Sequence, residues 1–148
     1  MLQHRHAARV PLGTELDLIK AYLCLFQTRY PEGLEVELAV PEAQHARLIL
    51  PMVGQLLVEN AVKHYRIEPD EPLLIRIRTK SYWLVVENTP RPLAYPAPAS
   101  TGVGLRNVQH RYEAAGAPQP VRIERTPEWF RVSLPLLPAG AQQATYSI

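Results

Sequence analysis

The chain has 148 residues, of which 47% are hydrophobic and 20% charged, and this suits one domain with one core. The net charge of +2 is too small to indicate a nucleic-acid or membrane partner, and the single cysteine, Cys24, excludes an internal disulfide or thiolate metal site. No apolar run is long enough to span a bilayer, so we expect a soluble, cytoplasmic domain. Fifteen prolines, about twice the usual share, are expected to separate the elements of a folded domain.

The first expected element is a helix, preceded by a flexible segment over residues 1–10. Its apolar residues recur at spacings of three and four: Leu12, Leu16, Ile19, Leu23, Phe26 and Tyr30. Thr14 is the expected N-cap, and Cys24 on this helix is expected to be a small packing residue. The stripe is also a heptad seam, so it fits packing on the domain's own core or on a partner helix outside this chain.

Alternating and periodic patterns place the remaining elements. We expect a strand over 34–40, a helix over 51–65 that begins at Pro51, and an antiparallel hairpin over 73–88 with its turn at 79–81. Residues 89–101 contain four prolines and no periodicity, which predicts a long loop. A helix from Gly102 to Gly116, strands over 121–125 and 129–134 and a loose tail over 139–148 follow. This order predicts an α+β domain, with helices packed on one face of a mixed, largely antiparallel sheet.

Two stretches carry candidate functional residues. In QLLVENAVKH, residues 55–64, Asn60 and His64 are four residues apart, as are Glu59 and Lys63, so each pair shares a helix face. Spacing alone equally fits an exposed face with one ion pair. In TGVGLRNV, residues 101–108, two glycines at a helix start let backbone N–H groups approach a phosphate, although a tight turn uses the same residues. A Walker P-loop and a Rossmann fingerprint are both absent.

Together, and in this order, the two stretches resemble the ATP-binding catalytic domain of sensor histidine kinases of the LytS/YehU type. The Asn box of that family corresponds to Leu56, Glu59, Asn60, Ala61, Lys63 and His64. Its glycine box corresponds to Gly102, Gly104, Leu105, Asn107 and Arg111. The segment VPLGTELDLIKAYLCLFQTRY resembles the one that precedes the Asn box in this type, and the resemblance covers about residues 10–135.

The resemblance implies a Bergerat-type fold over residues 11–138 that holds ATP and Mg²⁺ under a lid at about 89–101. Asn60 would be the magnesium ligand through its amide oxygen, and Glu59 the catalytic base or polarising group beside it. Backbone amides around Gly102 and Gly104 would hold the triphosphate. The implied cofactor-binding set is Asn60, Lys63, His64, Asn88, Gly102, Val103, Gly104, Leu105 and Arg106.

One motif of the family is altered. Its Asp-x-Gly-x-Gly box follows the hairpin, and the aspartate accepts a hydrogen bond from the adenine amino group. Strand alternation puts Leu84, Val86 and Asn88 on one face, so Asn88 takes the place of the aspartate. Asn88 offers a carbonyl acceptor without a charge, and Pro90 and Pro92 replace the two glycines.

The leading functional hypothesis is the catalytic domain of a two-component sensor kinase, which transfers the γ-phosphate of ATP to a histidine on a dimerisation domain. None of the five histidines here has the sequence context of that phosphoacceptor. The implied partners are the dimerisation domain and a response regulator, in a homodimeric, membrane-anchored sensor with this domain in the cytoplasm. The alternatives are a degenerate, non-catalytic module of the same fold, another branch of the same ATPase superfamily, or an unrelated α+β binding domain.

Overall fold

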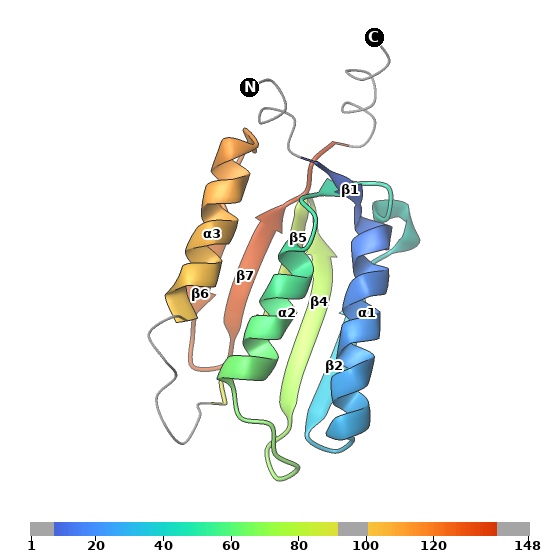
Figure 1. Ribbon diagram of the computed structural model, residues 1–148, viewed down its shortest axis with the longest axis vertical. Coiled ribbons are helices and arrows are strands. Elements are labelled where there is room, and N and C mark those ends of the chain that lie inside the picture. Colours follow the sequence, from blue (N-terminus) through green and yellow to red (C-terminus); the bar gives the residue numbers. More distant parts are fainter. Residues whose placement is uncertain (1–7, 92–100, 139–148) are drawn as a thin grey trace.

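A five-stranded sheet forms one layer of the computed structural model, which describes residues 8–91 and 101–138 (Figure 1). In sheet order the strands are β2 (Leu34–Ala39), β4 (Leu73–Lys80), β5 (Trp83–Asn88), β7 (Phe130–Pro135) and β6 (Arg122–Arg125). β2 runs parallel to β4, and the other neighbouring strands are antiparallel. The mixed, largely antiparallel sheet predicted from the sequence is confirmed.

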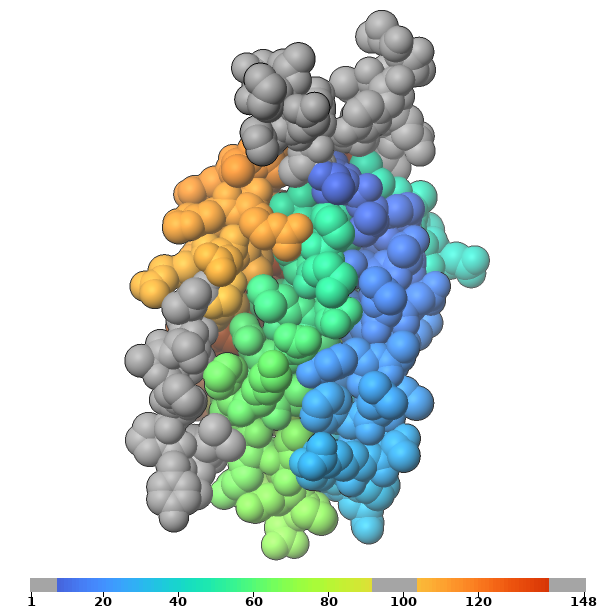
Figure 2. All heavy atoms as spheres, viewed as in Figure 1, coloured from blue at the N-terminus to red at the C-terminus, as the bar shows by residue number. Residues whose placement is uncertain are grey.

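Three helices form the second layer, on one face of the sheet: α1 (Leu12–Arg29), α2 (Val53–His64) and α3 (Thr101–Ala114). They lie side by side and cover that face (Figures 1 and 2). Alternate residues of the strands point toward them, so that Ile75, Ile77 and Leu84 are fully buried between the layers. None of the helices in the described ranges is long and apolar enough to cross a membrane.

The apolar stripe of α1 packs on the domain's own core. Leu12, Leu16, Ile19 and Leu23 are at most 2% exposed, which decides between the two alternatives that the sequence left open. The prediction for Cys24 is wrong, because its position beside the stripe places the thiol on the exposed side of the helix.

The start of α1 also differs from the prediction, because Pro11 rather than Thr14 is the residue before the helix. The first N–H groups of α1 are satisfied by backbone, with Leu12 N donating to Arg47 O at 2.7 Å and Gly13 N to His45 O at 3.0 Å. Three short elements were not predicted: β1 (Val10–Pro11), which pairs with β3 (Leu48–Ile49), and the 3-10 helix η2 (Glu42–Gln44).

The second helix begins at Val53, two residues later than predicted, because Met52 adopts a left-handed conformation with φ of 71°. The predicted hairpin is present, with β4 continuing to Lys80, so that Ser81 and Tyr82 form the turn. α3 ends in a Schellman motif as Gly116 predicted: Gly116 has φ of 72°, its N–H donates to Glu113 O, and Ala117 N donates to Tyr112 O.

The strands β6 and β7 begin one residue later than predicted, and β7 continues to Pro135. Residues 1–7 of the expected flexible N-terminal segment and the tail over 139–148 lie outside the described residues. Of the expected lid over 89–101, residues 92–100 also lie outside them, and Thr101 is the first residue of α3.

Candidate functional site

The two candidate stretches meet where α2 and α3 pack together. Gly104, in the first turn of α3, lies against Asn60 of α2: a Cβ at position 104 would be 3.6 Å from Asn60 Nδ2 and 3.9 Å from Oδ1. Leu56, one helical turn before Asn60, borders the same glycine, with its Cδ2 atom 4.0 Å from that position. The Asn box and the glycine box, separated by about forty residues of chain, thus meet at the Asn60 amide.

The other polar residues of the Asn box lie near the end of α2. Glu59 and Lys63 form an i, i+4 ion pair of 3.9 Å, in which the lysine side chain is 64% exposed. His64 is the last residue of α2 and is half-buried. The last turn therefore presents two basic side chains beside Asn60, and the loose ion pair leaves the lysine ammonium largely in solvent.

The glycine box contributes mainly backbone and helix geometry. Gly102 and Val103 lie in the first turn of α3, where backbone N–H groups have no partner within the helix. Leu105 is buried in the core and Arg106 is exposed. The start of α3 thus lies beside Asn60, with Leu105 anchoring it to the core.

Asn88 occupies the end of β5 on the helix side of the sheet. It is 4% exposed, its register partners are Ile75 on β4 and Phe130 on β7, and its Nδ2 donates to Thr89 O at 2.9 Å. Tyr65, directly after α2, lies beside Asn88, and its ring centroid is 6.2 Å from that of Phe130. The side chain predicted to replace the family's aspartate therefore lies beside two aromatic residues, Tyr65 and Phe130.

The Tyr65 hydroxyl has a raised pKa. Burial raises the pKa, while Arg125 and Asn88 lower it by less. The hydroxyl is thus neutral at physiological pH and retains its proton as a donor. Tyr65 was not predicted as a site residue, although its position directly after His64, the last residue of the Asn box, is a usable signal.

Two further residues hold the start of α2, a role that the sequence did not predict for either of them. Glu15, on α1, is 1% exposed and accepts hydrogen bonds from Met52 N at 3.1 Å and Gln55 N at 3.4 Å. Arg111 on α3 donates from Nη2 to Pro51 O at 2.8 Å. The arginine that matches the family's glycine box therefore contacts the backbone before α2, and α1 and α3 together fix where α2 begins.

The donor set at Asn60 fits a magnesium ion that is held jointly with phosphate oxygens. The amide oxygen is a hard ligand, and Mg²⁺ commonly takes few protein ligands and several from water and nucleotide phosphates. No group of three or more His, Cys, Asp or Glu residues arranged for a metal occurs in the described part of the chain. The absent Cβ of Gly104 leaves space beside the amide, so the site suits a metal bound with a nucleotide.

The chain is similar in sequence to LytS sensor proteins. No protein-family profile matches it. It is 41% identical to the sensor protein LytS of Bacillus cereus and 40% identical to that of Enterococcus faecalis, each over 63 residues. The sensor histidine kinase/phosphatase LytS of Staphylococcus aureus is 38% identical over the same length. These segments cover 43% of this chain and 11% of the relatives' length.

Solved structures of histidine kinases share the fold. The histidine kinase domain of the blue-light activated kinase EL346 from Erythrobacter litoralis has a TM-score of 0.59 at 17% identity, over 91% of this chain and 68% of that one. The cytoplasmic segment of QseC gives 0.56 at 17% identity, over 88% and 77%. The catalytic domain of ThkA gives 0.56 at 17% identity, over 88% and 99%. The chain therefore has the α+β fold of histidine-kinase catalytic domains and shares a homologous segment with the LytS sensor proteins.

Proposed function

We propose that this chain is the ATP-binding catalytic domain of a sensor histidine kinase, which transfers the γ-phosphate of ATP to a histidine on a separate dimerisation domain. The observation that carries the proposal is the contact between Asn60 and Gly104. It joins the two motifs of the resemblance at one place, in a fold shared with histidine-kinase catalytic domains. In this proposal residues 11–138 form the catalytic unit.

The proposed roles are those that the resemblance implies, and the position of Asn60 beside Gly104 supports them. Asn60 holds Mg²⁺ through its amide oxygen, and the ion supplies charge stabilisation for the triphosphate. Glu59 polarises the attacking histidine or accepts its proton. Lys63 and His64 contact the phosphates from the last turn of α2. The backbone of residues 102–106 donates to the phosphates at the positive end of α3. Asn88 accepts a hydrogen bond from adenine, beside the Tyr65 and Phe130 rings.

Substitution of Asn60 tests the proposal. We expect Asn60→Ala to weaken Mg²⁺-dependent ATP binding at least tenfold, measured by isothermal titration calorimetry. Gln27→Ala is the matched control, because it removes an exposed amide on α1. The free energy of unfolding of each variant should match that of the unmodified chain within about 0.5 kcal/mol. Equal ATP affinity in Asn60→Ala and the unmodified chain would show that the assignment of Asn60 is wrong.

A degenerate, non-catalytic module is the second candidate, and the surroundings of Asn88 favour it. The Asn88 amide is buried and already bonded to Thr89 O, and proline at positions 90 and 92 provides no N–H for the base. In that case the domain would act by contact with a partner kinase. Titration of the unmodified chain with ATP and ADP, with and without Mg²⁺, separates the two candidates: saturable binding contradicts the degenerate module, and its absence contradicts the kinase.

The partners follow from the kinase proposal. The domain would act on the phosphoacceptor histidine of a dimerisation domain in the same protein and so supply phosphate to a response regulator. The intact protein would be a homodimeric sensor anchored in the membrane, with this domain on the cytoplasmic side. LytS relatives are named as sensor proteins, which supports this arrangement.

A further inference from the structure

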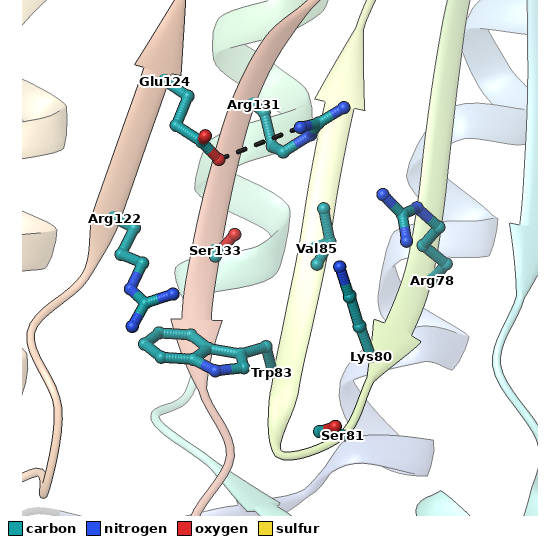
Figure 3. A pocket seen from close by; sticks show the side chains of 9 residues that line it. All are labelled: Arg78, Lys80, Ser81, Trp83, Val85, Arg122, Glu124, Arg131 and Ser133. Atoms are coloured by element: carbon teal, nitrogen blue, oxygen red, sulfur yellow. Dashed lines mark ion pairs between the residues drawn. The ribbon is translucent and has the colours of Figure 1, made fainter.

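The sheet face turned away from the helices carries a group of basic side chains that the proposed kinase reaction does not use. In Figure 3 the helices lie behind the sheet, and the labelled side chains lie on the other face. Strand alternation accounts for this, because residues facing away from the core occupy every second position. The group surrounds a shallow depression of about 360 Å³, lined by Arg78, Lys80, Ser81, Trp83, Val85, Arg122, Glu124, Arg131 and Ser133.

Two of the four cations around this depression are balanced by carboxylates. Glu87, whose side chain is fully buried, accepts from Arg78 Nε at 3.1 Å and Arg131 Nε at 2.6 Å. Glu124 lies 3.9 Å from Arg131. Among the residues that the structure describes, Lys80 and Arg122 form no ion pair with a carboxylate. The depression therefore has a surplus of two positive charges.

Contacts at the floor of the depression limit the motion of the three arginines. Arg122 lies over the Trp83 ring, with its guanidinium carbon 4.3 Å from the ring centroid, which limits the freedom of both side chains. Arg78 and Arg131 are held in place by Glu87, and their side chains are 30% and 28% exposed. Ser81 and Ser133 add hydroxyl groups. A ligand would thus meet arginines that are already held in place.

We propose that this depression, here called the β-face anion site, binds a small polyvalent oxyanion of the phosphate class. Its cations come from three strands and lie on different sides of the depression (Figure 3), which suits a tetrahedral oxyanion with acceptors on all sides better than a planar carboxylate. Its size suits a small molecule. The site lies on the face of the sheet opposite Asn60 and is independent of the proposed nucleotide site.

Inorganic pyrophosphate without Mg²⁺ is the ligand to test, with sodium chloride of equal ionic strength as the reference. The chain has two tryptophans, so Trp129→Phe leaves Trp83 as the reporter inside the site. We expect a saturable change in Trp83 fluorescence in this variant, and a matching one-to-one isotherm by calorimetry with the unmodified chain. The absence of a saturable signal in both measurements overturns the proposal.

Variants locate the binding. By calorimetry, Arg122→Ala should weaken pyrophosphate binding at least tenfold. Arg125→Ala, on the same strand but at a position that faces the other side, should change the affinity less than twofold. Asn60→Ala should also change it less than twofold, which separates this site from the nucleotide site. Equal losses in Arg122→Ala and Arg125→Ala, a loss confined to Asn60→Ala, or tighter binding of citrate than of pyrophosphate would each overturn the assignment.

Discussion

Glu15 is a charged residue in the core, and its partners explain why it is there. Its carboxylate accepts from two backbone N–H groups at the start of α2, where the helix dipole favours negative charge. Met52, one of the two donors, has a left-handed backbone, which is strained for a residue with a side chain. The buried carboxylate thus stabilises a strained turn and sets where α2 begins.

Replacement of Glu15 should therefore destabilise the domain. We expect Glu15→Ala to lower the free energy of unfolding by roughly 1–3 kcal/mol, because two N–H groups lose their acceptor and a gap remains in the core. Urea denaturation measures this. Asp17→Ala, which removes an exposed carboxylate from the same helix, should change it by less than about 0.5 kcal/mol. Equal effects of the two substitutions would contradict the capping role.

Sequence patterns predicted some residues of the site and could not predict others. Asn60 and His64 were placed on one helix face by their spacing alone, and strand alternation placed Asn88 on the helix side of β5. Glu15 was part of a family-like segment, but its role depends on a contact across 37 residues and on the conformation of Met52. Local periodicity carries no information on either.

At the scale of elements, α2 is packed between α1 and α3 through glycines. Gly54 faces α1, where a Cβ would lie 2.7 Å from Ile19 Cδ1, and Ile19 is fully buried. Gly104 faces Asn60, where a Cβ would make an ordinary contact of 3.6 Å. A side chain at position 54 would therefore crowd the buried Ile19, whereas the absence of one at position 104 leaves space at the proposed nucleotide site.

Alanine at the two glycines should therefore have opposite effects. We expect Gly54→Ala to lower the free energy of unfolding by roughly 1–2 kcal/mol, because overpacking against Ile19 outweighs the gain in helix propensity. Gly104→Ala should leave it unchanged or raise it by up to about 1 kcal/mol, yet weaken ATP binding at least fivefold. Thermal unfolding and calorimetry measure the two effects. Unchanged ATP affinity in Gly104→Ala would contradict a nucleotide beside Asn60.

The elements themselves were predicted best where periodicity was long. The hairpin of β4 and β5 and the core stripe of α1 follow directly from the spacing of their apolar residues. The starts of α1 and α2 were misplaced because backbone carbonyls and Glu15, rather than local side chains, satisfy their first N–H groups. Two-residue strands such as β1 and β3 are too short to show a period.

At the scale of the whole molecule, the sheet separates an apolar face from a charged one. Glu87, at the centre of the charged face, joins the three middle strands through Arg76, Arg78 and Arg131. Burial alone raises the pKa of Glu87, but hydrogen bonds and charge from Arg131 and Arg78 outweigh it and lower the pKa below its ordinary value of 4.5. The unfolded chain therefore binds a proton at higher pH than the folded domain does.

This pKa shift predicts how the stability of the domain depends on acid. The contribution of Glu87 is complete above pH 4.5 and is lost as the pH falls from there through the lower pKa of the folded state. We expect Glu87→Gln to cost roughly 1–3 kcal/mol at pH 7, with the difference from the unmodified chain shrinking below pH 4.5. Urea denaturation at several pH values measures this. Glu124→Gln, which neutralises an exposed carboxylate, should change the free energy of unfolding little at any of these pH values. A cost of Glu87→Gln that does not depend on pH would contradict the lowered pKa of Glu87.

The order of strands also leaves β2 and β6 at the two edges of the described sheet. β2 carries exposed Glu35 and Glu37, and β6 carries exposed Arg122 and Arg125 around Glu124. If two molecules joined their sheets through β2 in antiparallel register centred on Val36, Glu35 of one would meet Glu37 of the other across the new ladder. Negative charge along β2 thus disfavours symmetric self-association through that edge, to which open β-sheets are prone, whereas β6 alternates Arg122 with Glu124.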